Sequence, residues 1–226
     1  VQPFDNENAD WSSCEPYATY RAGGFMFYNN RWGGGEGCIS VKREGDAVTW
    51  WTTHDSNSPE QVTEAPLASI GMTWEGWAEN KSLPRKLKDI EELRLNWTVS
   101  LPPYEPGRRF VIYLQFYLND TGDDEKPNGD IGLIFYREGF EFENWGQFEG
   151  HHAIGDLVWS VVDKPTGGFG KYIMLAPEPN LQLTDNVLQI SNFDIAPILR
   201  FLVERGYYNP DKYLVHLSTS MESIVI

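Results

Sequence analysis

The sequence is poor in cysteine and in positive charge. Its 226 residues include two cysteines, Cys14 and Cys38, so at most one intrachain disulfide forms and no disulfide framework shapes the fold. Lysine and arginine number 18 against 33 aspartates and glutamates, which gives a formal net charge of −15. A surface this acidic repels the phosphates of nucleic acids and anionic membranes, so we expect neither as a partner. A neutral partner is compatible with this charge.

Long hydrophobic runs, repeats and low-complexity tracts are also missing from the sequence. No apolar run approaches the ~20 residues that a membrane span requires. A chain of this length buries roughly 70% of its unfolded surface, so it can fold without a structural metal. We therefore predict one domain over residues 14–226, preceded by a polar N-terminal arm over residues 1–13.

The motifs of several enzyme classes are absent too. The sequence has no Gly-rich phosphate loop, no Gly-x-Ser-x-Gly nucleophile elbow and no Cys–His nucleophile pattern. His151 and His152 are adjacent in what we expect to be a Gly-rich loop, and no cysteine or further histidine stands at metal-ligand spacing from them. We therefore expect no metal site and no cofactor.

Aromatic residues, in contrast, make up 14% of the chain, more than core packing usually requires. Neutral polysaccharides are bound by stacking on aromatic rings and cleaved by paired carboxylates. Short aromatic and β-branched runs alternate with Gly, Asn, Asp and Pro clusters, which is typical of a sandwich or jelly roll. The runs expected to form strands are Phe25–Tyr28, Ile39–Val41, Ala47–Thr53, Leu93–Leu101, Phe110–Leu118, Ile131–Tyr136, Leu157–Val162, Lys171–Ala176, Leu188–Ile190 and Tyr213–Ile226.

One helix is predicted near the C-terminal end. Asp194 is a good N-cap, Pro197 falls in the first turn, where its missing N–H costs little, and Gly206 follows the last apolar residue of the pattern. We expect the apolar stripe of this helix to pack on one face of a sheet. The residues that recur at helical spacing are Ile195, Ile198, Leu199 and Leu202.

Several weak signals point to the extracellular space. Glycosylation sequons begin at Asn80, Asn96 and Asn119. The chain starts at Val1 without a methionine, as a mature product does after a signal peptide is removed. Together with a cysteine pair that is compatible with a disulfide, these features favour a secreted protein.

Several segments, in order along the chain, carry a resemblance to a known family. Cys14–Tyr20, Tyr28–Gly33 and Gly37–Ile39 resemble the opening of glycoside hydrolase family 12, in which a disulfide brackets an Asn-Asn-x-Trp-Gly segment. Leu83–Arg85 and Phe193–Glu222 are similar to later parts of the same family. The resemblance implies an all-β, two-sheet β-jelly roll sandwich (concanavalin-like) with one α-helix, a disulfide between the two cysteines and an open groove.

The same resemblance implies retaining cleavage of β-1,4-glucans or xyloglucan by two glutamates, whose carboxyl groups must lie ~5–5.5 Å apart. Glu222 fills the position of the acid/base, but Gly132 stands in the place of the nucleophile and Leu114 in that of a supporting aspartate. Asp130 lies two residues before Gly132, so on a regular strand it points to the same face and could act on a water there. The groove positions carried over from the family are Tyr17, Trp32, Ile134, Tyr136 and Glu222.

These departures predict a secreted protein that binds β-glucan, a neutral polysaccharide, with catalysis weakened or absent. One alternative is an active endo-β-1,4-glucanase in which Glu222 works with Asp130 or another acid. The other is an extracellular structural subunit. The family's closing strand has no counterpart before Ile226, which leaves a sheet edge that the arm of a neighbouring copy could pair with, forming a homo-oligomer by strand exchange.

Overall fold

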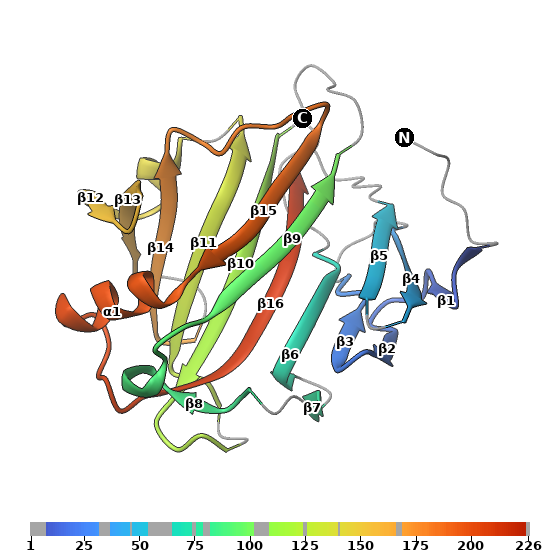
Figure 1. Ribbon diagram of the computed structural model, residues 1–226, viewed down its shortest axis with the longest axis horizontal. Coiled ribbons are helices and arrows are strands. Elements are labelled where there is room, and N and C mark those ends of the chain that lie inside the picture. The colour runs from blue at the N-terminus through green and yellow to red at the C-terminus, as the bar shows by residue number, and fades with distance from the viewer. Residues whose placement is uncertain are drawn as a thin grey trace.

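A computed structural model describes residues 8–31, 37–45, 47–53, 65–73, 76–78, 82–101, 109–123, 126–139, 141–165 and 169–224. Over these residues the chain forms strands in two layers and a single α-helix (Figure 1). The expected all-β, two-sheet jelly-roll fold with one helix is confirmed. Within the same ranges, no helix has the length and apolar character needed to cross a membrane.

One sheet of 11 strands forms the larger layer. Its main order is β12-β13-β14-β11-β10-β16-β6-β3-β2, with β7 paired to β6 and β8 to β16. β11 and β14 run parallel, whereas their other neighbours are antiparallel. The strands are β2 (Thr19–Ala22), β3 (Phe25–Tyr28), β6 (Leu67–Thr73), β7 (Gly76–Ala78), β8 (Arg85–Lys86), β10 (Arg109–Asn119), β11 (Gly129–Glu138), β12 (Gln147–Ile154), β13 (Leu157–Lys164), β14 (Lys171–Glu178) and β16 (Tyr213–Ile224).

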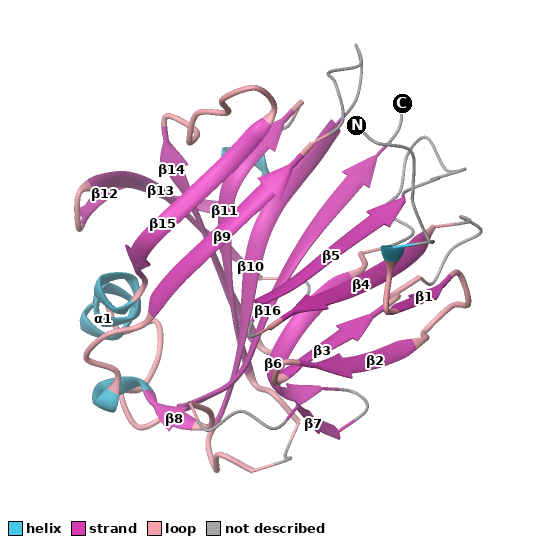
Figure 2. Ribbon diagram, turned by 45° about the vertical axis from the view of Figure 1, so that its right-hand side comes forward, coloured by secondary structure: helices cyan, strands magenta, loops and turns pink. Residues whose placement is uncertain are grey.

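The second layer consists of two separate sheets (Figure 2). The first contains β1 (Trp11–Ser13), β4 (Cys38–Glu44) and β5 (Ala47–Thr53), and the second contains β9 (Arg94–Ser100) and β15 (Val187–Asp194). β9 and β15 cross over β10 and β11, as both ribbon views show (Figures 1 and 2). Among the described residues, β5 pairs only with β4, and β9 pairs only with β15.

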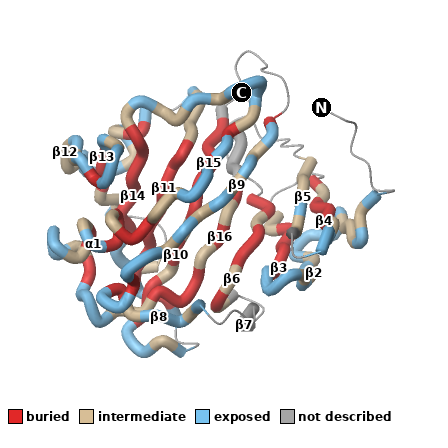
Figure 3. Tube along the Cα trace, in the orientation of Figure 1, coloured by how far each residue is buried: buried red, intermediate tan, exposed pale blue. Residues whose placement is uncertain are grey.

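The main hydrophobic core lies between β9, β15 and α1 (Ala196–Glu204) on one side and the large sheet on the other (Figure 3). Successive side chains of a strand point to opposite faces, so alternate residues of β10 and β11 enter this core. Phe110, Ile112, Leu114, Leu133 and Phe135 are among them. We call the opposite face of the large sheet, from β12 to β6, the site face. Two short 3-10 helices, η2 (Leu87–Asp89) and η3 (Phe142–Trp145), complete the elements.

The predicted helix agrees closely with the structure. Asp194 Oδ1 accepts hydrogen bonds from the backbone N–H groups of Ala196 (3.1 Å) and Leu93 (3.0 Å), so it ties the start of α1 to β9. Gly206 follows the helix with a φ of 74°, a conformation that glycine adopts without a steric penalty. All four residues of the apolar stripe are buried in the main core.

Two other expectations need correction. Residues 11–13, assigned to the N-terminal arm, form β1 and pair with β4, so the described end of the arm is part of the domain. His151 and His152, expected in a loop, lie in β12, an edge strand of the large sheet. The late strand from Tyr213 is confirmed as β16, and it runs inside the sheet between β10 and β6.

Candidate functional site

Side chains of the site face fall in rows that cross the strands, because residues paired between neighbouring strands point to the same side. Successive rows along one strand lie about 6.6 Å apart, since each residue advances the strand by about 3.3 Å. From the β11–β10–β16 pairings, the rows are Asp130–Tyr117–His216, Gly132–Gln115–Ser218, Ile134–Tyr113–Ser220 and Arg137–Val111–Glu222.

This register separates the residues expected to act together. The row of Gly132 and the row of Glu222 lie four residues apart along β10, about 13 Å at the usual rise. Asp130 lies six residues of β10 away from the row of Glu222, about 20 Å. Paired carboxylates in glycoside hydrolysis stand about 5–9.5 Å apart. The register of the strands therefore does not bring Asp130 and Glu222 together. Glu222 is placed by its backbone alone, because its side chain lies outside the described residues.

Asp130 is nevertheless a fully buried acid on the site face, near the start of β11. Gln115 Nε2 donates to both carboxylate oxygens, at 3.2 and 3.0 Å, which confirms that Asp130 and Gln115 share this face. Burial raises the pKa of Asp130 to about 7, against the opposing effects of Gln115 and of the positive charge of Lys164. The carboxyl group thus titrates near neutral pH.

The space above Gly132 is taken by Tyr172 of β14. A Cβ atom at position 132 would lie 2.9 Å from Tyr172 Oη and 3.2 Å from its Cε2, both closer than ordinary van der Waals contact. The phenol ring therefore occupies the region into which a side chain at position 132 would project. Gly132 is also the residue type that lets this ring approach the strand, a common reason for glycine within a sheet.

An apolar cluster fills the site face over β11, β13 and β14. We call it the inner cluster, and it is capped by Phe142 of η3, which is fully buried, with Trp145 packed against it. Ile134, expected to contact substrate, belongs to this cluster and is 1% exposed, so a bound polymer would not reach it. The buried members are Val111, Tyr113, Ile134, Phe142, Val162, Tyr172, Met174 and Ala176.

Small hydroxyl residues line the neighbouring part of the site face on β6 and β16. Ser69, Ser218 and Ser220 are buried, and Ser69 Oγ and Ser220 Oγ donate to the backbone oxygens of Met26 and Pro66. The floor of an open groove would be exposed to solvent. The expectation of an open groove is therefore not met at these serines or at the inner cluster.

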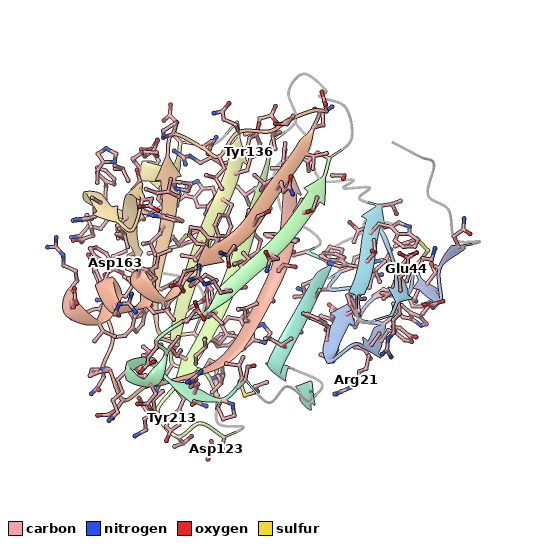
Figure 4. All side chains as sticks on the ribbon, viewed as in Figure 1. Arg21, Glu44, Asp123, Tyr136, Asp163 and Tyr213 are labelled. Carbon is pink, nitrogen blue, oxygen red and sulfur yellow. A yellow bond between two sulfur atoms is a disulfide. The ribbon has the colours of Figure 1, made fainter. Side chains whose placement is uncertain are left out.

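The other predicted groove residues are scattered. Tyr17 is 49% exposed and stands 6.1 Å, centre to centre, from the ring of Tyr28. Tyr136 packs against the main core on the side of β11 that faces β15, since a bulge at Ile112/Tyr113 shifts the register (Figure 4). Trp32 lies outside the described residues. Of the positions that the structure describes, only Tyr17 is exposed for a ligand.

Leu114 also differs from its expected role. Its side chain is buried in the main core, on the face opposite Gly132, so a carboxylate at this position would not reach the site face. Gln115, one residue later, is the polar side chain that faces Asp130. Neither Gln115 nor Tyr172 was identified from the sequence. Alternation along β10 could have found Gln115, because a core-facing Leu114 places the next side chain on the site face.

The predicted disulfide between Cys14 and Cys38 is present. The three sequons differ in their surroundings. Asn96 lies exposed on β9, whereas Asn119 is buried, with its Nδ2 donating to Asp123 O and its Oδ1 accepting from Gly122 N. A glycan on Asn119 would break these contacts, so this position is unsuited to modification. Asn80 lies outside the described residues.

Comparison with solved structures identifies the fold. The endoglucanase Cel12A from Rhodothermus marinus superposes with a TM-score of 0.75 at 19% identity, covering 95% of this chain and 93% of that one. A native family 12 xyloglucanase from Bacillus licheniformis gives a TM-score of 0.70 at 18% identity over 95% and 94% of the two chains. The architecture is therefore that of the family 12 glycoside hydrolases.

The sequence itself is also similar to a curated protein of this class. The xyloglucan-specific endo-β-1,4-glucanase A of Emericella nidulans is 22% identical over 216 residues, which cover 92% of this chain and 82% of that enzyme. No known family profile matches the sequence. The chain is thus a family-12-like protein, and the resemblance inferred from its motifs is confirmed.

Proposed function

We propose that the protein is a secreted β-glucan-binding protein in which hydrolysis at the centre of the site face is weakened or absent. The similarity to an enzyme named for xyloglucan, over 92% of this chain and 82% of that enzyme, supports a β-1,4-linked glucan as the ligand. The exposed Tyr17 supports a carbohydrate ligand, because sugars stack on aromatic rings.

The weakened chemistry rests on one observation, the phenol ring of Tyr172 over Gly132. Glycine supplies no carboxylate, and the ring leaves little room for one. A covalent glycosyl intermediate needs a carboxylate nucleophile, so the retaining route is closed at this position. Asp130 does not replace it, because it lies about 20 Å along the sheet from the row of Glu222.

Native gel electrophoresis with xyloglucan or β-1,4-glucan cast in the gel tests the proposal, alongside a reducing-sugar assay. We expect retardation by β-glucan, no retardation by an α-glucan control, and no release of reducing ends. Sustained hydrolysis that Glu222→Gln abolishes would overturn the loss of catalysis and establish the active endoglucanase. Absence of retardation by any β-glucan would overturn the binding function.

A second candidate, a structural subunit that assembles by strand exchange, has one supporting observation. In the described part of the chain, the facing edges of the second layer, β5 and β9, each have a single partner. An edge of this kind accepts an added strand from another chain. Light scattering during size-exclusion chromatography separates the two candidates, because a monomer at high concentration excludes assembly.

A further inference from the structure

A polar cluster lies on the site face at the β12–β14 end of the large sheet, away from the central rows. Its middle residue is Ser160 of β13, which is fully buried. Ser160 Oγ lies 3.0 Å from Glu178 Oε1 and 3.1 Å from His151 Nδ1. A third group, Glu143 Oε1 of η3, is 3.5 Å away. We call Glu143, His151, Ser160 and Glu178 the acceptor cluster.

The acceptor cluster holds more acceptors than donors. Ser160 has one hydroxyl hydrogen, so it donates to one neighbour at a time, and His151 Nδ1 accepts from it or donates to it according to the tautomer of the imidazole. The nearby cation, Arg137, is already engaged, since it forms an ion pair with Glu178 and donates to Asn180 Oδ1 at 3.3 Å. The carboxylate of Glu143 therefore keeps its capacity to accept hydrogen bonds from a ligand.

An exposed aromatic ring stands beside these acceptors. Phe148 of β12 is 40% exposed, and its ring centre lies 5.1 Å from that of His151 in an edge-on arrangement. Trp145 of η3 is partly exposed and packs against the inner cluster. An apolar ring next to carboxylates is the combination that a pyranose needs, since its hydroxyls donate hydrogen bonds and its C–H face packs on aromatic rings.

The cluster is also continuous with the row of Glu222. Arg137 pairs with Val111 across β11 and β10, and Val111 pairs in turn with Glu222 on β16. Arg137 forms an ion pair with Glu178 on β14. Glu178 accepts a hydrogen bond from Ser160 on β13, the strand next to β12. The backbone positions of this row thus lead across the sheet from β16 to the strands of the acceptor cluster near the β12 edge (Figure 1).

We infer that the acceptor cluster and Phe148 form a binding subsite for a sugar unit of a β-linked glucan. The inference rests on the proposed function and places part of the binding surface at the β12–β14 end. Sugar hydroxyls would donate to Glu143 and Glu178 while the Phe148 ring packs against the sugar. The carboxylates disfavour an anionic ligand, and no three metal-binding side chains come together in the described part of the chain.

Isothermal titration of β-1,4-gluco-oligosaccharides of two to six units tests the subsite. In Phe148→Ala we expect the affinity for the six-unit oligosaccharide to fall about threefold to tenfold, the range of one aromatic contact. Glu143→Gln should weaken binding in the same direction. Phe25→Ala is the matched control, because Phe25 is 39% exposed on β3, far from the cluster, and should bind as the wild type does.

The outcomes separate the subsite from the proposed function. If the wild type binds the oligosaccharides and Phe148→Ala binds them equally well, the subsite is refuted while glucan binding stands. If the wild type binds no oligosaccharide and no glucan polymer, both proposals are refuted. A loss in Phe25→Ala equal to that in Phe148→Ala would also refute the subsite, because the effect would not depend on the cluster.

Discussion

The centre of the site face packs apolar side chains under η3, whereas the β12–β14 end of the same face carries charged groups and an exposed ring. At the centre, Phe142 and Ile134 are buried and Tyr172 covers Gly132. At the end, Phe148 is exposed beside the carboxylates of Glu143 and Glu178. One sheet thus offers two different environments to a ligand.

The difference shows how the fold accommodates a glycine on this face of the sheet. A glycine without a neighbour would leave a cavity, and cavities lower stability. In this protein the phenol ring of Tyr172 fills the space, so the region above Gly132 is closely packed. At the β12–β14 end, by contrast, Phe148 stays exposed to solvent.

The strongest test of this contrast compares two phenylalanines. Phe142→Ala should lower the free energy of unfolding by about 3–5 kcal/mol, because a fully buried ring is removed from the inner cluster. Phe148→Ala should change it by less than about 0.5 kcal/mol, because that ring is 40% exposed. Urea denaturation of the two variants measures both. Similar losses would mean that the centre and the end are packed alike.

A pH series tests the burial of Asp130. Its pKa is about 7 in the folded protein and near 3.8 when unfolded, so the folded state holds the proton more tightly. The stability linked to this group is fully present below about pH 4 and is lost as the pH rises toward 7. The stability of the wild type relative to Asp130→Asn should therefore fall by roughly 3–4 kcal/mol between pH 4 and 7.

His216 lies in the same row as Asp130, beyond Tyr117, and gives the stability the opposite dependence on pH. Burial lowers its pKa to about 4, so its contribution is present above pH 6.5 and is lost as the pH falls toward 4. The two groups oppose each other, so the stability of the wild type alone varies less with pH. The difference in stability between the wild type and Asp130→Asn isolates the contribution of the carboxyl group. A difference that does not vary with pH would show that Asp130 is ionised and solvated in the folded protein.

The fold could be predicted well because its signals are local. Alternating apolar residues between Gly, Pro and Asn clusters identified β3 and β5 at their full length and β10 and β11 within a few residues. Asp194, Pro197 and Gly206 predicted the start and end of α1. Short or polar strands such as β2, β8 and β12 were missed, since they lack a continuous apolar run.

The site was harder to predict because it depends on register. The spacing of Asp130 and Gly132 correctly placed both on one face, but the sequence says nothing about which residues of β16 lie opposite them. The bulge at Ile112/Tyr113 turned Tyr136 toward the core. The contact of Tyr172 with Gly132 joins β14 to β11, two strands separated by a long stretch of sequence, and no local pattern encodes it.

The smallest expected effect tests that contact directly. Gly132→Ala should lower the free energy of unfolding by about 1–2 kcal/mol, because the new Cβ would lie 2.9 Å from Tyr172 Oη in a close-packed region. In a Tyr172→Phe background the nearest atom is gone, so the same change should cost less. The coupling between the two changes, measured by a double-mutant cycle in urea, should be at least about 0.5 kcal/mol.

The size of that coupling shows which part of Tyr172 restricts position 132. If Gly132→Ala is equally costly with Tyr or Phe at position 172, the hydroxyl does not set the space above the strand, and the ring edge at 3.2 Å remains as the constraint. If Gly132→Ala is neutral in both backgrounds, the ring does not lie over the glycine. Room for a side chain would then exist at position 132, and close packing by Tyr172 would no longer support the proposal of weakened catalysis.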